Sequence, residues 1–159
     1  MVQASDVDTD NVAAYSNCKA SCDAFFNRHN KDSKTPAWLI LDANHRRRYT
    51  LESLNPGADL SQFLQTDLLF QASNLQEMAQ VLHLDEACFL VTIRRWNAMC
   101  EEGVDEDFQK GKDAYQRFLG DPNVQSNPNM GSVSKVPFYT VAIWPGDIGT
   151  QWGQVGCGG

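Results

Sequence analysis

The chain has 159 residues, of which 42% are hydrophobic and 10% aromatic, and it carries a formal net charge of −7. This composition suits one globular domain with a substantial apolar core. An acidic chain without a basic stripe argues against nucleic-acid binding, because phosphate recognition needs clustered lysine and arginine. The one basic cluster, Arg46, Arg47 and Arg48, is interpreted as a solvated or ion-paired turn.

The first ten residues, MVQASDVDTD, are acidic and polar. We therefore predict that residues 1–10 are disordered and form neither a signal peptide nor a transit peptide. No apolar run approaches the roughly 20 residues that a membrane helix requires. The sequence accordingly predicts no membrane span and a cytoplasmic location.

Five cysteines, an odd number, in a chain without a signal peptide do not indicate a disulfide framework. Cys18 and Cys22 lie one helical turn apart, and His29 follows them, but their spacing matches no closed zinc pattern. They are interpreted as thiols on a helix, and no metal site is predicted. The histidines, His29, His45 and His83, follow no catalytic pattern and are interpreted as surface or turn residues.

Periodicity divides the first half of the chain into short elements. Residues 11–30 carry an apolar stripe at helical spacing and are predicted to be a helix. Residues 37–41 (AWLIL) are a short apolar run typical of a buried strand. The Leu54–Gly57 segment is a turn, because proline fixes one dihedral and glycine permits a positive one. Residues 67–71 are predicted to be a second short strand.

Two helices follow. Asn74 is the expected N-cap of the first, with Glu77 three residues later completing a capping box. The second begins at Asp85 and ends near Gly103, where glycine supplies a left-handed stop. Residues 104–136 are polar and rich in turn sequences, with a helical piece at 114–119.

Residues 138–144 form the clearest strand, bounded by Pro137 and Pro145. The element order predicts an α+β domain in which a helical hairpin packs on a small mixed sheet.

The C-terminal residues run from apolar and aromatic into a glycine-rich end. Glycines let backbone amides approach a ligand closely, but the chain holds no dinucleotide-binding fingerprint and no Walker sequence. Tyr139 follows Phe138 in the strand, where it either packs in the core or donates a hydrogen bond to a ligand carbonyl. Residue types alone leave both roles open.

Several stretches, taken in order, resemble one enzyme family. They are PAWLILD (36–42), RRRY (46–49), GVDEDF (103–108), GDP (120–122), NPN (127–129), PFY (137–139) and PGDIGT (145–150). In this order and at this spacing they resemble the FAD-dependent 3-ketosteroid dehydrogenases, within the fumarate reductase/succinate dehydrogenase flavoprotein group. The resemblance extends over about residues 11–150.

The resemblance implies that residues 11–136 are the C-terminal part of a cap, or substrate-binding, domain. It implies that residues 137–159 are a strand and glycine-rich segment re-entering an FAD-binding domain that this chain lacks. The implied reaction dehydrogenates a 3-ketosteroid or similar cyclic ketone by proton abstraction and hydride transfer to flavin. The implied sites are Tyr139, on the substrate carbonyl, and the flavin contacts Gly146, Asp147, Gly149, Thr150 and Gly153.

Two departures from the family leave the activity of the chain open. The N-terminal fingerprint that holds the FAD pyrophosphate is absent, and Trp152 replaces the first glycine of a glycine pair. We therefore expect the lone chain to be inactive. It is either a fragment of such an oxidoreductase or a non-catalytic, stand-alone binding or interaction domain derived from its cap. The fragment predicts exposed apolar surface and association, and the stand-alone domain predicts a stable monomer.

Overall fold

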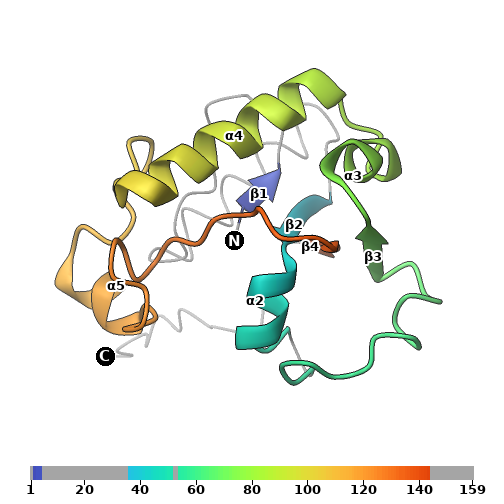
Figure 1. Ribbon diagram of the computed structural model, residues 1–159, viewed down its shortest axis with the longest axis horizontal. Coiled ribbons are helices and arrows are strands. Elements are labelled where there is room, and N and C mark those ends of the chain that lie inside the picture. Colours follow the sequence, from blue (N-terminus) through green and yellow to red (C-terminus); the bar gives the residue numbers. More distant parts are fainter. Residues whose placement is uncertain (1, 5–35, 52–53, 144–159) are drawn as a thin grey trace, which may run out of the picture.

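The computed structural model describes residues 2–4, 36–51 and 54–143 (Figure 1). Four strands form one sheet in the order β1–β2–β4–β3. Their bounds are Val2–Ala4 (β1), Ala37–Leu41 (β2), Leu69–Ala72 (β3) and Phe138–Ile143 (β4). The α+β class is confirmed by this arrangement of sheet and helices.

The prediction of a mixed sheet is wrong, because every pairing among the described strands is antiparallel. The path of the chain explains the difference. β3 ends at Ala72 and β4 begins beside it at Phe138, so the segment between them returns to the same end of the sheet. A parallel pair would have needed a crossover to the opposite end.

Two helices form the predicted hairpin: α3 spans Leu75–Val81 and α4 spans Glu86–Glu102. The Asn74 side chain accepts a hydrogen bond from the Glu77 amide at 2.8 Å, and that of Asp85 accepts from the Cys88 amide at 2.7 Å. α4 ends at Gly103, whose φ is 73°. These caps confirm the predicted boundaries. The Glu77 carboxylate reaches the Ser73 amide rather than that of Asn74.

The helical hairpin covers one face of the sheet. In Figure 1 α4 runs across the sheet, with α3 beside it. The shared core contains residues from β2, β3 and β4, from both helices and from the loop before β4: Ile40, Ala72, Met78, Ala79, Leu82, Phe89, Ile93, Val133 and Phe138. Burial of these side chains is the main force holding the hairpin on the sheet.

The opposite face of the sheet, here called the second face, carries the alternate residues of the same strands. Leu39, Leu41 and Leu69 are buried there beneath Leu51 and Leu60 of the connection between β2 and β3. Tyr139, Val141 and Ile143 of β4 pack against this cluster but stay half-buried. The period of two along β4 therefore separates a covered face from a partly open one.

A short helix, α2 (Ala43–Arg48), follows β2 where the sequence predicts a solvated turn. Asp42 caps it by accepting from the His45 amide at 2.8 Å. Arg46 is only 4% exposed, and His45, interpreted as a surface or turn residue, is half-buried within the helix. Both interpretations are wrong because the helix turns one side toward the protein.

The remaining elements agree more closely with expectation. The helical piece predicted at 114–119 is α5 (Ala114–Leu119). The strand predicted at 67–71 is β3, which begins and ends slightly later. The strand predicted at 138–144 is β4, and its last predicted residue lies outside the described residues.

The N-terminus differs from expectation. The composition of residues 1–10 predicts disorder, but Val2–Ala4 pair with Trp38–Ile40 as β1. The open edge of β2 offers main-chain hydrogen bonds that a polar sequence can use as well as an apolar one. The rest of that segment and the helix predicted at 11–30 lie outside the described residues.

Candidate functional site

Tyr139 lies on the second face of the sheet. It pairs with Leu41 of β2 and Gln71 of β3, and its ring packs against the leucine cluster of that face. β4 carries it toward the segment expected to hold the flavin contacts. Those residues, Gly146, Asp147, Gly149, Thr150 and Gly153, lie outside the described residues, so their roles stay predictions, as does a carbonyl contact by Tyr139.

The motif segment, residues 103–131, contains GVDEDF, GDP and NPN. Asp105 is buried, and its carboxylate accepts hydrogen bonds from the amides of Asp107, Phe108 and Lys110. Asn127 is buried too and donates to the carbonyls of Gly103, at 3.1 Å, and Lys110, at 2.8 Å. Two buried polar side chains thus satisfy the backbone of one loop.

Two glycines of the motif segment are required by close packing. Gly111 has φ 77°, and a Cβ there would lie 2.1 Å from the Asn127 side-chain oxygen. A Cβ on Gly120 would lie 2.6 Å from Cβ of Pro128. The glycines and the NPN motif of this segment therefore specify the shape of a loop.

A hydrogen bond joins two of the motifs. The Tyr49 hydroxyl, from RRRY, donates to the Asp121 carboxylate, from GDP. Burial, and then this bond, raises the pKa of Tyr49. The bond connects α2 with the motif segment, and the space between those two elements is hollow.

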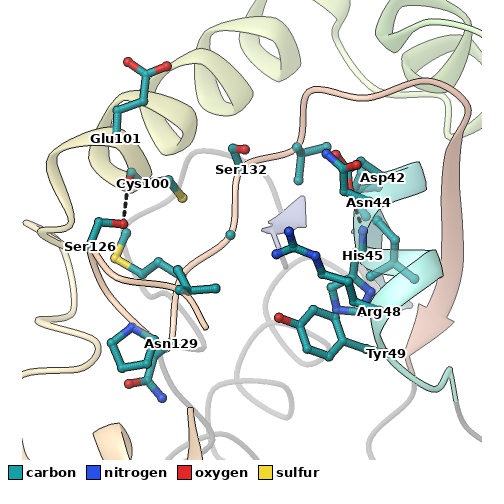
Figure 2. Close-up of a pocket in the computed structure, with 17 residues that line it drawn as sticks. Asp42, Asn44, His45, Arg48, Tyr49, Cys100, Glu101, Ser126, Asn129 and Ser132 are labelled. Carbon is teal, nitrogen blue, oxygen red and sulfur yellow. Dashed lines mark hydrogen bonds between the residues drawn. The ribbon is translucent and has the colours of Figure 1, made fainter. Parts of the chain in front are cut away.

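That space is a cavity of about 370 Å³ (Figure 2). In Figure 2 His45 and Arg48 of α2 and the following Tyr49 lie on one side, and Cys100, Ser126 and Asn129 on the other. The other residues of the lining are Ile40, Leu41, Asp42, Asn44, Glu101, Val124, Pro128, Met130, Gly131, Ser132 and Val133. The size is within the range of small-molecule pockets.

The polar groups of the cavity suit hydrogen bonding rather than nucleophilic chemistry. Burial lowers the pKa of His45 to about 4, so its ring is neutral at pH 7. Burial raises the pKa of Cys100 to about 11, so its sulfur stays a thiol. Nδ1 of His45 and Oδ1 of Asn129 are buried without a partner among the described residues. Both atoms belong to residues that line the cavity.

The junction between β2 and α2 tests whether the described residues fit the FAD pyrophosphate. A strand that enters a helix through a glycine turn is where such groups bind. Here Asp42, 1% exposed, occupies that junction, and its carboxylate also accepts from the amides of Ser134 and Lys135. A buried carboxylate repels phosphate, so this junction does not fit the pyrophosphate group.

Within the described ranges, no group of three or more His, Cys, Asp or Glu side chains lies close enough to hold a metal ion. No helix in that part of the chain is long and apolar enough to cross a membrane.

Comparison with known proteins identifies related sequences. No protein-family model matches the chain. The chain is 42% identical over 119 residues to the 3-oxosteroid 1-dehydrogenase of Mycolicibacterium smegmatis, in an alignment covering 74% of the chain and 21% of that protein. It is 31% identical over 125 residues to the 4-oxocyclohexanecarboxylate 2-dehydrogenase of Sinomonas cyclohexanicum, covering 78% and 21%.

A solved structure shares the fold. It is the 3-ketosteroid delta1-dehydrogenase of Sterolibacterium denitrificans in complex with 1,4-androstadiene-3,17-dione. The TM-score is 0.74 at 30% sequence identity, over 80% of this chain and 24% of that one. The chain spans about a fifth of the length of the curated relatives it matches.

Sequence and fold together define a segment of an oxidoreductase family. The matched residues are homologous to a segment of the 3-oxosteroid 1-dehydrogenases, as the ordered motifs suggested.

Proposed function

We propose that this chain is the substrate-side part of an FAD-dependent dehydrogenase acting on a 3-ketosteroid or a similar cyclic ketone. The observation that carries the proposal is the likeness to the Sterolibacterium denitrificans enzyme, which was solved in complex with a steroid dione. In this proposal residues 11–136 are the later part of the substrate-binding domain. Residues 137–159 lead back toward an FAD-binding domain supplied by the rest of the protein.

The reaction removes two hydrogens from adjacent ring carbons and leaves a carbon–carbon double bond. A base takes the proton next to the ketone, and the hydride leaves the neighbouring carbon for the flavin. Negative charge develops on the ketone oxygen, where a hydrogen-bond donor stabilises it. Tyr139 is the proposed donor in this chain, with Gly146, Asp147, Gly149, Thr150 and Gly153 as the proposed flavin contacts.

The second face of the sheet supports a role in binding an apolar ring system. Tyr139, Val141 and Ile143 are half-buried on one side of β4, next to a leucine cluster. Ligand pockets are mostly apolar with a few polar groups that fix orientation. A fused-ring ketone needs that combination, because most of its surface is hydrocarbon and its polar atoms are few.

A chimeric enzyme tests the proposal. The segment of the Mycolicibacterium smegmatis enzyme that aligns with this chain is replaced by the corresponding 119 residues of this chain. Dehydrogenation of a 3-oxosteroid is then followed with an artificial electron acceptor. We expect the chimera to turn over, and Tyr139→Phe to lower kcat by roughly 100- to 1,000-fold. Tyr115→Phe is the matched control, because Tyr115 is 64% exposed on α5. A chimera that folds and holds flavin but does not oxidise the steroid would contradict the proposal.

The alternative is a stand-alone binding domain without catalysis. It is favoured by the poor fit of the β2–α2 junction to a pyrophosphate. Size-exclusion chromatography and thermal unfolding of the lone chain separate the two functions. Association through exposed apolar surface supports the dehydrogenase segment, whereas a monomer with a cooperative melt supports the alternative.

A further inference from the structure

Arg46 of α2 is a buried cation without a counter-charge among the described residues. The residue is 4% exposed. The one described hydrogen bond of its side chain runs from a terminal nitrogen to the carbonyl of Ala58, at 3.4 Å. Nε and the other terminal nitrogen are buried and have no partner in the described part of the chain.

Three described carboxylates from the segments around α2 accept hydrogen bonds from groups other than Arg46. Asp42 accepts from the amides of His45, Ser134 and Lys135. Asp59 accepts from the amide and hydroxyl of Ser61. Asp121 accepts from Tyr49 and Asn123. Among the described contacts, none of the three carboxylates pairs with the Arg46 guanidinium.

A guanidinium stays charged at any ordinary pH, so it cannot escape the cost of burial by losing its proton. A buried charge that lacks a partner costs several kcal/mol in typical proteins. Each of the two unused nitrogens of Arg46 offers an N–H group that a carboxylate oxygen can accept.

We propose that Arg46 is the receptor for a carboxylate that lies outside the described residues and that the rest of the whole protein supplies. Ala58, whose carbonyl lies 3.4 Å from a terminal nitrogen of Arg46, belongs to the exposed segment at residues 55–59, so the site lies close to the surface. The relatives are about five times longer than the matched segment, which leaves ample chain to provide the carboxylate. This inference does not depend on the proposed reaction.

Acetate is the probe for the site in this 159-residue chain. Thermal unfolding is measured in sodium acetate and in sodium chloride at equal ionic strength and pH. We expect acetate to raise Tm by about 2–4 °C over chloride, because an anion bound only by the folded chain stabilises it. Arg46→Met is expected to abolish the difference and to have the higher Tm in chloride, because it removes an unpaired buried charge.

Arg47→Met is the matched control. Arg47 is the neighbouring residue of the same helix, but it is exposed and bonds Asn44 at 2.6 Å. It is expected to keep the full acetate effect. If Arg46→Met does not fold, Arg46→Lys takes its place. Its ammonium is a point charge without the fork, so at least about half of the acetate effect should disappear.

A second set of measurements distinguishes two sources of the carboxylate, a protein side chain and a small molecule. The family includes a relative named for a substrate that is itself a carboxylate. If 4-oxocyclohexanecarboxylate stabilises the chain no more than acetate does, the site recognises only the carboxylate group. This result is expected if a protein side chain supplies that group. An Arg46-dependent effect well above that of acetate, and absent with cyclohexanone, would overturn the proposed source and indicate a small-molecule site. No acetate effect, or one that survives Arg46→Met, would overturn the site itself.

Discussion

The motif segment buries polar side chains, whereas the second face of the sheet leaves apolar side chains partly exposed. In residues 103–131, buried polar groups such as Asp105 and Asn127 find hydrogen-bond partners within the loop. On the second face, β4 presents Tyr139, Val141 and Ile143 half-buried against leucines. The motifs GVDEDF, GDP and NPN therefore lie where the chain builds a loop. The proposed chemistry lies on a strand, where the signals are the PFY stretch and the alternation of side chains.

Gly111→Ala is the substitution that we expect to destabilise the motif segment most. The new methyl would lie 2.1 Å from the Asn127 oxygen, at a residue with φ 77°. We expect a loss of about 3–5 kcal/mol in unfolding free energy, because strain and a lost hydrogen-bond network add together. Denaturant unfolding of this chain, followed by tryptophan fluorescence, measures the loss.

Gly57→Ala is the matched control for backbone strain. Gly57 has φ 74°, but a Cβ there meets nothing within 4 Å. Its cost should be about 1 kcal/mol, from the left-handed conformation alone. Equal losses in the two variants would mean that the contact with Asn127 contributes nothing.

Asn127→Ala is the second test of the motif segment. It leaves the carbonyls of Gly103 and Lys110 without this donor in a buried environment. We expect a loss of about 2–3 kcal/mol. Asn123→Ala is the control, because Asn123 is exposed and bonds only Asp121 among the described residues. A loss no larger than that of the control would contradict the network.

The sequence predicts elements well where the signal is local. Asn74, Asp85 and Gly103 end helices through their own side chains or backbone freedom, so α3 and α4 are found without knowledge of the rest. The sequence does not predict α2, because its cap, Asp42, follows directly on a strand and its three arginines form no apolar stripe.

Features assembled from distant residues are not predictable in the same way. The antiparallel order requires β4 to insert between β2 and β3, which no local pattern records. The cavity joins α2 to the end of α4 and to residues 124–133. Tyr139 stands out through its place in the PFY stretch, but its face of the sheet follows from the pairing with Leu41.

His45 lines the cavity and gives a pH test of it. Its pKa is about 4 in the folded chain, against an ordinary value of 6.5 for an exposed imidazole. Between these values the unfolded chain binds more protons, so stability should be full above pH 6.5 and fall as the pH is lowered toward 4. We expect a loss of about 1–2 kcal/mol, reduced by the partial exposure of the ring.

Urea unfolding at several pH values between about 7 and 4 measures this loss. His45→Gln is the control, because it removes the titrating ring but keeps a polar side chain. The difference in stability between the two chains should shrink toward low pH. A difference that is constant with pH would mean that the imidazole is not held neutral by burial.

The smallest expected effect on stability belongs to Tyr139→Phe. The substitution keeps the ring that packs on the leucine cluster and removes only a hydroxyl from a half-buried position. Unfolding free energy should change by less than about 0.5 kcal/mol, because partly exposed hydroxyls contribute little. Urea unfolding of the lone chain checks this. A loss above about 1.5 kcal/mol would mean that the hydroxyl serves the fold. An unchanged unfolding free energy of the lone chain, together with a fall in kcat in the chimera, would show that the hydroxyl is needed for activity and not for folding. The ring would then serve the sheet, as Asn127 serves the loop, and the hydroxyl would be left for the substrate.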